Sequence, residues 1–425
     1  MPLLVQVIGK QPPPPSDGSG FQANGPVDMR HLTELALVAG ATAADYSNEQ
    51  PDTFTITRAG IDFVIDGSFT YTGGLPDPGG TVGSITVNAD RYEIFAPFNF
   101  TVAQFDALFA TANPLTIIST LLAGDNPPSA HGEIKGSGFG DSLYGFGGQD
   151  LILAGPGGNN NRLHGGAGND SLSAGGGNDS MYGGPGNDLF SVPGGEVASG
   201  VIHDYIDGGT GNDTLNFYSG GFSALHVALN GSHPSVATVG ANITLTLVNI
   251  ENIGGTTTND RLIGDSHKNA LYGFGGNDTI SGGAGNDSLD GGHGHNLLSG
   301  GPGRDSFVFD SAMIGGFAGD TPRSTVTDFH AGIDRIVLDI QIFDSLTYTG
   351  TLSPANFLAA PHAVYGHNGQ QFLVYDTVTG NLYYDPTGMG PSPTFHEIAH
   401  LDHAPKLHAS DIHLIMQEFL IPGFA

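Results

Sequence analysis

The stretch GGAGNDSLDGGHGHNLLSGGPGRDSFVF occupies residues 282–309 and repeats a pattern of nine residues. In each repeat a turn rich in glycine leads to Asp287, Asn296 or Asp305, and an apolar residue follows two positions later. Glycine accepts positive φ angles, so a turn of the type GGxGxD can point successive carbonyl oxygens to one side. The three residues after the turn then form a short strand with one side chain directed inward. This period of nine decides the fold.

The frame of nine residues extends over two arrays, joined by a region with the alternation of strands. Two nonapeptides close one coil of eighteen residues, so acidic side chains should form columns along both edges, paired at that spacing. The predicted pairs are Asp170 with Asp188, Asn161 with Asp179, Asp260 with Asp278, Asn269 with Asp287, and Asp287 with Asp305. Only the apolar residues lie inside the coils, so the sequence predicts two parallel β-rolls with a thin core.

Columns of carboxylates repel one another unless a cation lies between them. Carboxylates and turn carbonyls in a flexible loop suit Ca²⁺, which takes six to eight oxygen ligands, better than Mg²⁺, which needs a rigid octahedron. We therefore predict about six to eight calcium ions. The predicted ligand side chains are Asp141, Asp150, Asn161, Asp170, Asp179, Asp188, Asp204, Asp213, Asp260, Asn269, Asp278, Asp287, Asn296 and Asp305. The predicted turn residues are Gly166, Gly168, Gly184, Gly186, Gly276, Gly283, Gly285, Gly301 and Gly303.

The alternative to a metal-binding roll is a flexible, glycine-rich linker with acidic decoration. A linker has no reason to keep an apolar residue two positions after each acidic residue. The 68 glycines among 425 residues also exclude collagen, which needs glycine at one third of all positions.

Composition limits the possible partners. Lys plus Arg is 12 and Asp plus Glu is 42, so the net charge is 12 − 42 = −30. This charge argues against DNA, RNA and anionic lipid, which are bound mainly through Lys and Arg. The absence of cysteine excludes disulfides, Cys-ligated zinc and thiol catalysis. No apolar run approaches the ~18 residues of a membrane span, so no stable membrane insertion is expected. A cleaved N-terminal secretory signal is not expected either.

The pattern changes along the chain divide it into six parts. Alternating pairs such as Phe54 with Ile56 and Phe63 with Ile65 indicate strands, and residues 102–122 have helical spacing. We predict an all-β protein whose N-terminal β-rich domain carries a helical cover. The parts are a Pro/Gly-rich tail (1–25), the N-terminal domain (26–128), the first roll (129–215), a β insertion (216–250), the second roll (251–310) and a β-rich C-terminal segment (311–425).

The repeats, GGAGNDSLS at 165–173 and residues 282–309 above all, resemble those of hemolysin-type calcium-binding (RTX) proteins. The likeness covers roughly residues 130 to 420, since the stretches 326–338 and 374–385 and Ala409-Ser-Asp411 resemble the segment that follows the roll in this family. The resemblance implies export by a type I secretion system of a Gram-negative bacterium, with an uncleaved signal at about 370–425. Asn161, Asn269 and Asn296 depart from the usual Asp, which puts calcium affinity at those positions in doubt.

Other constellations favour structural interpretations. His396-Glu397-Ile-Ala-His400 matches HExxH, but that zinc motif requires a helix. The nearby prolines and the RTX-like context predict a strand, which would separate the two histidines by ~13 Å. The turn histidines are expected to be exposed, a weak transition-metal surface being the alternative. Asp62 and Asp66 could form a functional pair of carboxylates, although a solvent-exposed strand face explains them as well. The turn histidines are His131, His293, His295, His330, His362 and His367.

Two functions fit these patterns. The first is a secreted, extracellular calcium-binding exoprotein whose rolls fold on binding Ca²⁺ and act as a binding or structural module, with calcium and the type I secretion machinery as partners. The second is a secreted enzyme, a hydrolase or polysaccharide-modifying protein, with the rolls as its folding and secretion tail. The small N-terminal domain shows no nucleophile or base constellation, which favours the first. The sequence does not identify its ligand.

Overall fold

The computed structural model describes residues 132–135, 142–154, 160–192, 202–217, 222–309, 324–390 and 396–416, and the backbone of strands between residues 4 and 101. The chain divides into two compact units, Met1–Gly211 and Asn212–Ala425. The predicted helical cover at 102–122, Asp141, His131 and the last nine residues lie outside the described residues. No helix in the described ranges is long and apolar enough to cross a membrane.

An antiparallel sheet precedes the first roll. Its strands pair in the order β2-β3-β4-β7-β8, and β1 pairs antiparallel with β8 and parallel with β9. The predicted tail therefore differs from the structure over Leu4–Gly9, where a β-branched, apolar run adds a strand to the sheet. Asp62 and Asp66 lie on β4, whose side chains are outside the described set. The strands are β1 (Leu4–Gly9), β2 (Tyr46–Gln50), β3 (Thr53–Arg58), β4 (Ile61–Ser68), β5 (Tyr71–Thr72), β6 (Leu75–Pro76), β7 (Thr81–Asn88) and β8 (Tyr92–Thr101).

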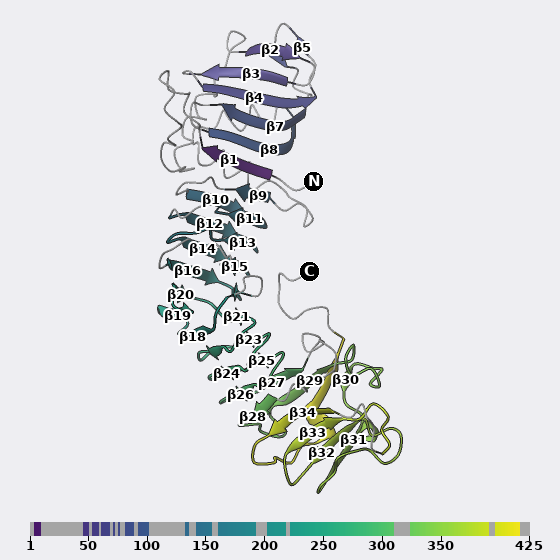
Figure 1. The fold of residues 1–425 in the computed structure, drawn as a ribbon. Helices are drawn as coiled ribbons and strands as arrows, with labels where there is room; N and C mark the ends of the chain where they lie inside the picture. The colour runs from purple at the N-terminus through teal and green to yellow at the C-terminus, as the bar shows by residue number, and fades with distance from the viewer. Residues whose placement is uncertain are drawn as a thin grey trace. The chain divides into compact units, whose positions relative to one another are not determined.

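The first roll has two parallel faces built from alternate strands of the chain (Figure 1). On one face β10, β12, β14 and β16 pair in order, and on the other β9, β11, β13 and β15 do. The register aligns the apolar positions, as in Leu143 with Leu163 and Ile152 with Leu172. The strands are β9 (Gly132–Lys135), β10 (Ser142–Gly147), β11 (Asp150–Leu153), β12 (Arg162–Ala167), β13 (Ser171–Ser173), β14 (Ser180–Pro185), β15 (Leu189–Ser191) and β16 (Ile202–Thr210).

The second unit begins with β17 (Thr214–Asn216) and an antiparallel meander, β18 (Leu225–Ala228), β19 (Ser235–Val239) and β20 (Ile243–Val248). The second roll then follows the pattern of the first. One face pairs β17, β21, β23, β25, β27 and β29, and the other pairs β18, β22, β24, β26 and β28. The strands are β21 (Asn252–Gly254), β22 (Arg261–Ile263), β23 (Ala270–Tyr272), β24 (Thr279–Ser281), β25 (Ser288–Asp290), β26 (Leu297–Ser299), β27 (Ser306–Phe309), β28 (Ser324–Val326) and β29 (Arg335–Asp339).

The C-terminal segment continues both faces of the second roll without nonapeptides. β34 pairs parallel with β28, β35 pairs parallel with β29, and a small sheet of β31, β32 and β33 adds to β34. β30 pairs antiparallel with β35. The elements are β30 (Gly350–Thr351), η4 (Pro354–Asn356), β31 (Phe357–Ala360), β32 (Leu373–Asp376), β33 (Asn381–Tyr384), β34 (His396–Leu401), η5 (Ala409–Asp411) and β35 (Ile412–Ile415).

The core of each roll is a single stack of the apolar residues that the frame of nine marks. Each of these side chains is at most 1% exposed, so the stack excludes water along its length. The parallel β-roll fold predicted from the sequence is confirmed. The residues are Leu143, Ile152, Leu163, Leu172, Met181, Phe190, Ile206 and Leu215, then Leu262, Leu271, Ile280, Leu289, Leu298 and Phe307.

Candidate calcium-binding turns

The acidic side chains form hydrogen-bonded columns along the edges of the rolls. In most repeats the Asp accepts, through Oδ1, the main-chain N–H of the repeat residue one coil earlier, as in Asp287 N–H to Asp305 Oδ1 at 2.9 Å. All five pairs predicted at a spacing of eighteen are joined in this way. The coil lengthened before Asn161 keeps the column, because Asp150 N–H donates to Asp170 Oδ1 at 2.9 Å. Asp204 joins through Asp179 N–H at 2.8 Å.

A second column, which was not predicted from the sequence, is formed by the asparagine that precedes the acidic position. Here Oδ1 accepts the N–H of the residue one coil later, so these bonds run opposite to those of the Asp column. Asn277 N–H donates to Asn259 Oδ1 at 2.7 Å, and Asn187 N–H donates to Asn169 Oδ1 at 2.8 Å. The recurring Asn-Asp dipeptide is the sequence feature from which this column could have been predicted. Its neutral amides couple adjacent coils without a metal.

The predicted ligand side chains are buried at the column positions, with exposures of 5% or less wherever the structure describes them. Oδ1 of Asp170, Asp188, Asp278, Asp287 and Asp305 accepts a column hydrogen bond. The second carboxylate oxygen has no such partner in several repeats. The Oδ2 atoms of Asp150, Asp170, Asp204, Asp278, Asp287 and Asp305 are buried with no hydrogen-bond partner among the described residues. A buried, unpartnered carboxylate oxygen is unfavourable unless a cation or a donor compensates it.

Carbonyl oxygens converge on the same space. A Cβ atom added at Gly145 would collide with both Asp150 Oδ2 and the carbonyl oxygen of Gly165. Gly273 is placed in the same way between Asp278 Oδ2 and the carbonyl oxygen of Gly291. At each of these two glycines, two acceptor oxygens from successive coils thus lie close to the same point. A set of oxygen ligands suits a hard cation, and Ca²⁺ is the ion that such flexible loops prefer.

The electrostatics agree with the geometry. Burial, followed by the charge of Asp170, raises the pKa of Asp150 to about 8. Burial likewise raises the pKa of Asp278 to about 8 and that of Asp204 to about 7. It raises the pKa of Asp287 to about 6, where the hydrogen bond from Asn269 acts in the opposite direction. Without a cation, these carboxylates are costly to ionise in the folded roll.

The predicted turn glycines have the backbone that the turns require. Gly166, Gly168, Gly184, Gly186, Gly276, Gly283, Gly285 and Gly301 have φ between 90° and 147°. Gly303 is the exception, because it is not among the residues with positive φ. It is restricted by packing instead: a Cβ there would overlap the carbonyl oxygen of Gly285, with which Gly303 forms a parallel bridge. The assignment of these residues as calcium ligands remains a prediction.

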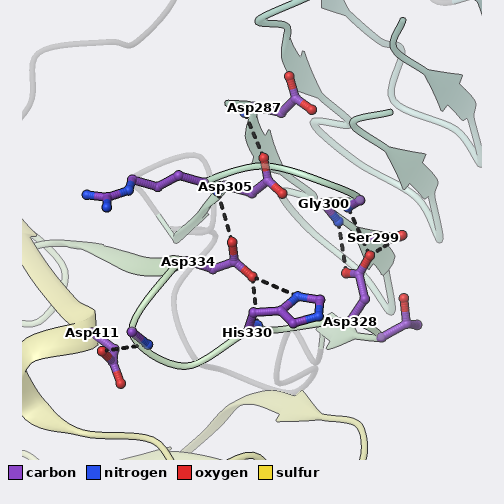
Figure 2. A network of polar contacts seen from close by, with 12 residues as sticks. Asp287, Ser299, Gly300, Asp305, Asp328, His330, Asp334 and Asp411 are labelled. Atoms are coloured by element: carbon purple, nitrogen blue, oxygen red, sulfur yellow. Dashed lines mark hydrogen bonds and ion pairs between the residues drawn. The ribbon is translucent and has the colours of Figure 1, made fainter. Parts of the chain in front are cut away.

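The columns extend beyond the nonapeptides through carboxylates that were not predicted as ligands (Figure 2). Asp305 N–H donates to Asp334 Oδ1 at 3.0 Å, and Gly332 N–H donates to Asp411 Oδ1 at 3.2 Å. Asp328 accepts the N–H groups of Gly300 and Gly301, each at 2.9 Å. The period of eighteen does not mark Asp334, because it follows Asp305 by 29 residues.

The HExxH stretch is a strand, as predicted, within β34. His400 is held there by its neighbours: Nδ1 lies 2.6 Å from Asn381 Oδ1, and Nε2 lies 3.1 Å from Asp402 Oδ1. Burial lowers the pKa of His396. In the described ranges no group of three or more His, Asp or Glu side chains is placed to hold a metal. The turn histidines that are described, His293, His295, His330, His362 and His367, are exposed as expected.

The fold and the turns define a class of protein, the parallel β-roll with acidic, glycine-rich turns. The family model of the RTX calcium-binding nonapeptide repeat, which describes four copies, matches residues 133–159, 156–190, 203–220, 254–289 and 272–307. Over these residues the repeats are therefore of the RTX calcium-binding nonapeptide type. A comparison with curated proteins found no match.

Among solved structures, the chain is similar to a subunit of the mannuronan C5-epimerase from Azotobacter vinelandii. The identity is 27%, over 39% of this chain and 84% of that one, with a TM-score of 0.26. It is also similar to the extracellular lipase LipA from Serratia marcescens, at 14% identity over 75% of this chain and 51% of that one, with a TM-score of 0.19. At these TM-scores neither likeness bears on the activity of the chain.

Proposed function

We propose that the chain is a secreted calcium-binding exoprotein whose β-rolls fold on binding extracellular Ca²⁺ and serve as a binding or structural module. The observation that carries this proposal is the set of buried, unpartnered Oδ2 atoms. Beside those of Asp150, Asp170 and Asp278 lies a main-chain carbonyl oxygen of the next coil. Bound calcium would supply the positive charge that these buried oxygen atoms lack. About six to eight ions would cancel roughly half of the net charge of −30.

Folding outside the cell follows from the same chemistry. In the metal-free chain the eleven Asp residues at the predicted ligand positions repel one another, and the single stack of apolar residues is thin. Sites of this kind in extracellular modules have dissociation constants of about 0.1–1 mM, well above cytosolic calcium. The chain would therefore remain unfolded in the cytosol, which suits passage through a type I secretion channel.

Calcium titration of the full chain tests the first part of the proposal. Circular dichroism should show a gain of strand as millimolar Ca²⁺ is added to protein kept in EGTA, with Mg²⁺ at the same concentration as the control. An identical spectrum in EGTA and in calcium would contradict the proposal.

Secretion is tested by deletion in a host with a type I system. Removal of residues 371–425 should retain the protein in the cytosol, and removal of residues 1–25 should not. Secretion that survives the C-terminal deletion would show that the signal lies elsewhere.

The second candidate, a secreted enzyme, would place catalysis in residues 26–128. Assay of the calcium-loaded chain against casein, lipid esters and polysaccharides separates the two. Turnover of any of them would move the enzyme to first place.

A further inference from the structure

The turns of the two rolls are of two kinds, which we call open and closed. In an open turn the Oδ2 atom of the acidic residue is buried without a partner, as described for Asp150, Asp170, Asp204, Asp278, Asp287 and Asp305. In a closed turn the chain's own groups satisfy the side chain at the same position. The closed turns are those of Asp179, Asp260, Asn269 and Asn296.

Three closed turns share one device, a main-chain N–H four residues before the side chain. Thr256 N–H donates to Asp260 Oδ2 at 2.6 Å, and the Thr256 hydroxyl donates to Asp260 Oδ1 at 2.8 Å. Asp265 N–H donates to Asn269 Oδ1 at 2.8 Å. Gly175 N–H donates to Asp179 Oδ2 at 3.1 Å. Each of these N–H groups donates to the side-chain oxygen that corresponds to the unpartnered Oδ2 atom of an open turn.

The fourth closed turn uses the amide itself. Asn296 Oδ1 accepts Asp278 N–H at 2.8 Å, so it keeps the column intact. Its Nδ2 donates to the carbonyl oxygen of Gly292 at 3.3 Å. Beside Gly291 this Nδ2 takes the place that Asp287 Oδ2 takes beside Gly282. A donor thus stands where an open turn presents a second acceptor.

The difference has a sequence basis in the first two residues of each turn. The open turns for which these residues are described start with Gly-Gly or Gly-Phe, at positions 145, 165, 273, 282 and 300. Three closed turns start with Ala174-Gly175, Gly255-Thr256 and Gly264-Asp265. At the open turns Gly166, Gly283 and Gly301 have φ between 90° and 111°, whereas Gly175, Thr256 and Asp265 have no positive φ.

We propose that the open turns hold the calcium ions and that the closed turns hold none, so that metal-bound and metal-free couplings both occur within one roll. This inference rests on the proposed function. A carboxylate that already accepts two or three hydrogen bonds is stabilised as an anion, and a cation entering a closed turn would have to face the positive end of an N–H group. At an open turn the buried Oδ2 atom would coordinate the cation, and no hydrogen bond to another group of the described chain has to be broken.

Two isosteric variants of the full chain test the assignment. Asp287→Asn changes an open turn and Asp260→Asn changes a closed turn of the same roll. Equilibrium dialysis in saturating calcium should give one ion fewer per chain for Asp287→Asn and the wild-type number for Asp260→Asn. Equal losses in the two variants would overturn the inference while leaving the proposed function intact. A wild-type chain that binds no calcium would overturn the proposed function itself.

The reverse change covers the case in which Asp287→Asn does not fold. Asn296→Asp replaces the closing Nδ2 with an oxygen and should add one calcium ion to the wild-type number, because Asp278 and Gly292 keep their places around it. Folding of this variant is verified by its strand signal in saturating calcium. A number equal to or below that of the wild type would overturn the inference.

Discussion

The second roll and the C-terminal segment that follows it share their sheets but differ in how their acidic column is satisfied. In the roll, the Oδ2 atoms of Asp287 and Asp305 are buried and have no hydrogen-bond partner among the described residues. In the segment, Asp334 Oδ2 accepts His330 N–H at 2.7 Å, and Asp411 Oδ2 accepts His408 N–H at 2.9 Å. The imidazole Nδ1 atoms of these histidines lie 3.6 Å and 3.4 Å from the same oxygens. One column can therefore be completed by a cation or by the chain itself.

This difference places the need for a cation in the turns and not in the roll architecture. The strands of the segment pair in parallel with the last strands of the roll, so the sheet is continuous across the change. In the described part of the segment, Asp334 and Asp411 are each completed by N–H groups of the chain.

Calcium removal should have the largest effect. In EGTA the amides of Leu271 and Leu289, which lie in the roll, should lose protection from hydrogen exchange, because the bare carboxylates then repel. The amides of Leu382 and Leu414, in the segment, should keep theirs. Calcium re-addition is the control. Simultaneous loss of protection in both regions would show that roll and segment do not differ in their need for calcium.

A charge in the stacked core comes next. Leu289 is fully buried and pairs with Leu271 and Phe307 in the adjacent strands. Leu289→Asp should destabilise the roll by more than about 4 kcal/mol and prevent its folding even in excess calcium. Ser288→Asp, one residue earlier and directed away from the core, is the matched control. A calcium-induced gain of strand in Leu289→Asp equal to that of the control would show that the coils do not stack as described.

The metal-free roll should respond to pH in a direction set by the raised pKa values. Asp150 and Asp278 have folded pKa values of about 8 against an ordinary value of 3.8, so the folded state holds protons that the unfolded state releases. The resulting stability is present below about pH 4 and is lost as the pH rises toward 8. In EGTA the strand signal should therefore fall between about pH 5 and pH 8. A flat profile, or a rise with pH, would contradict this.

Calcium should act in the opposite direction, because binding needs ionised carboxylates. The calcium concentration at half-folding should fall as the pH rises over the same range. The two trends together separate a proton-stabilised roll from a calcium-stabilised one.

Much of the roll could be predicted from the residues alone. The period of nine placed the apolar stack, the pairs at eighteen and the two arrays, because each coil repeats the same turn and the same inward side chain. The strand at HExxH was predictable from Pro391 and Pro393, which disfavour a helix there. These features are local or periodic.

The rest depended on contacts without a period. The spacing from Asp305 to Asp334 is not a multiple of nine, and Asp411 meets Gly332 across 79 residues. The strand β1 needed partners 80 residues and more along the chain. The period of nine does not distinguish Asp260 from Asp278, since both are Asp in the same frame; the Thr256 donor separates them in the structure.

The smallest effect is expected at the HExxH strand, within the C-terminal segment. Glu397→Ala should leave the calcium concentration at half-folding unchanged, because β34 contains none of the Asp residues whose Oδ2 atoms are buried without a partner. His400→Ala removes the contacts to Asn381 and Asp402 and should lower the stability of the segment by about 1 kcal/mol. Elemental analysis after dialysis should find no retained zinc in the wild type, since the strand places His396 and His400 ~13 Å apart. One equivalent of zinc, lost in both His396→Ala and His400→Ala, would show that this stretch binds metal and would give the segment a metal dependence of its own.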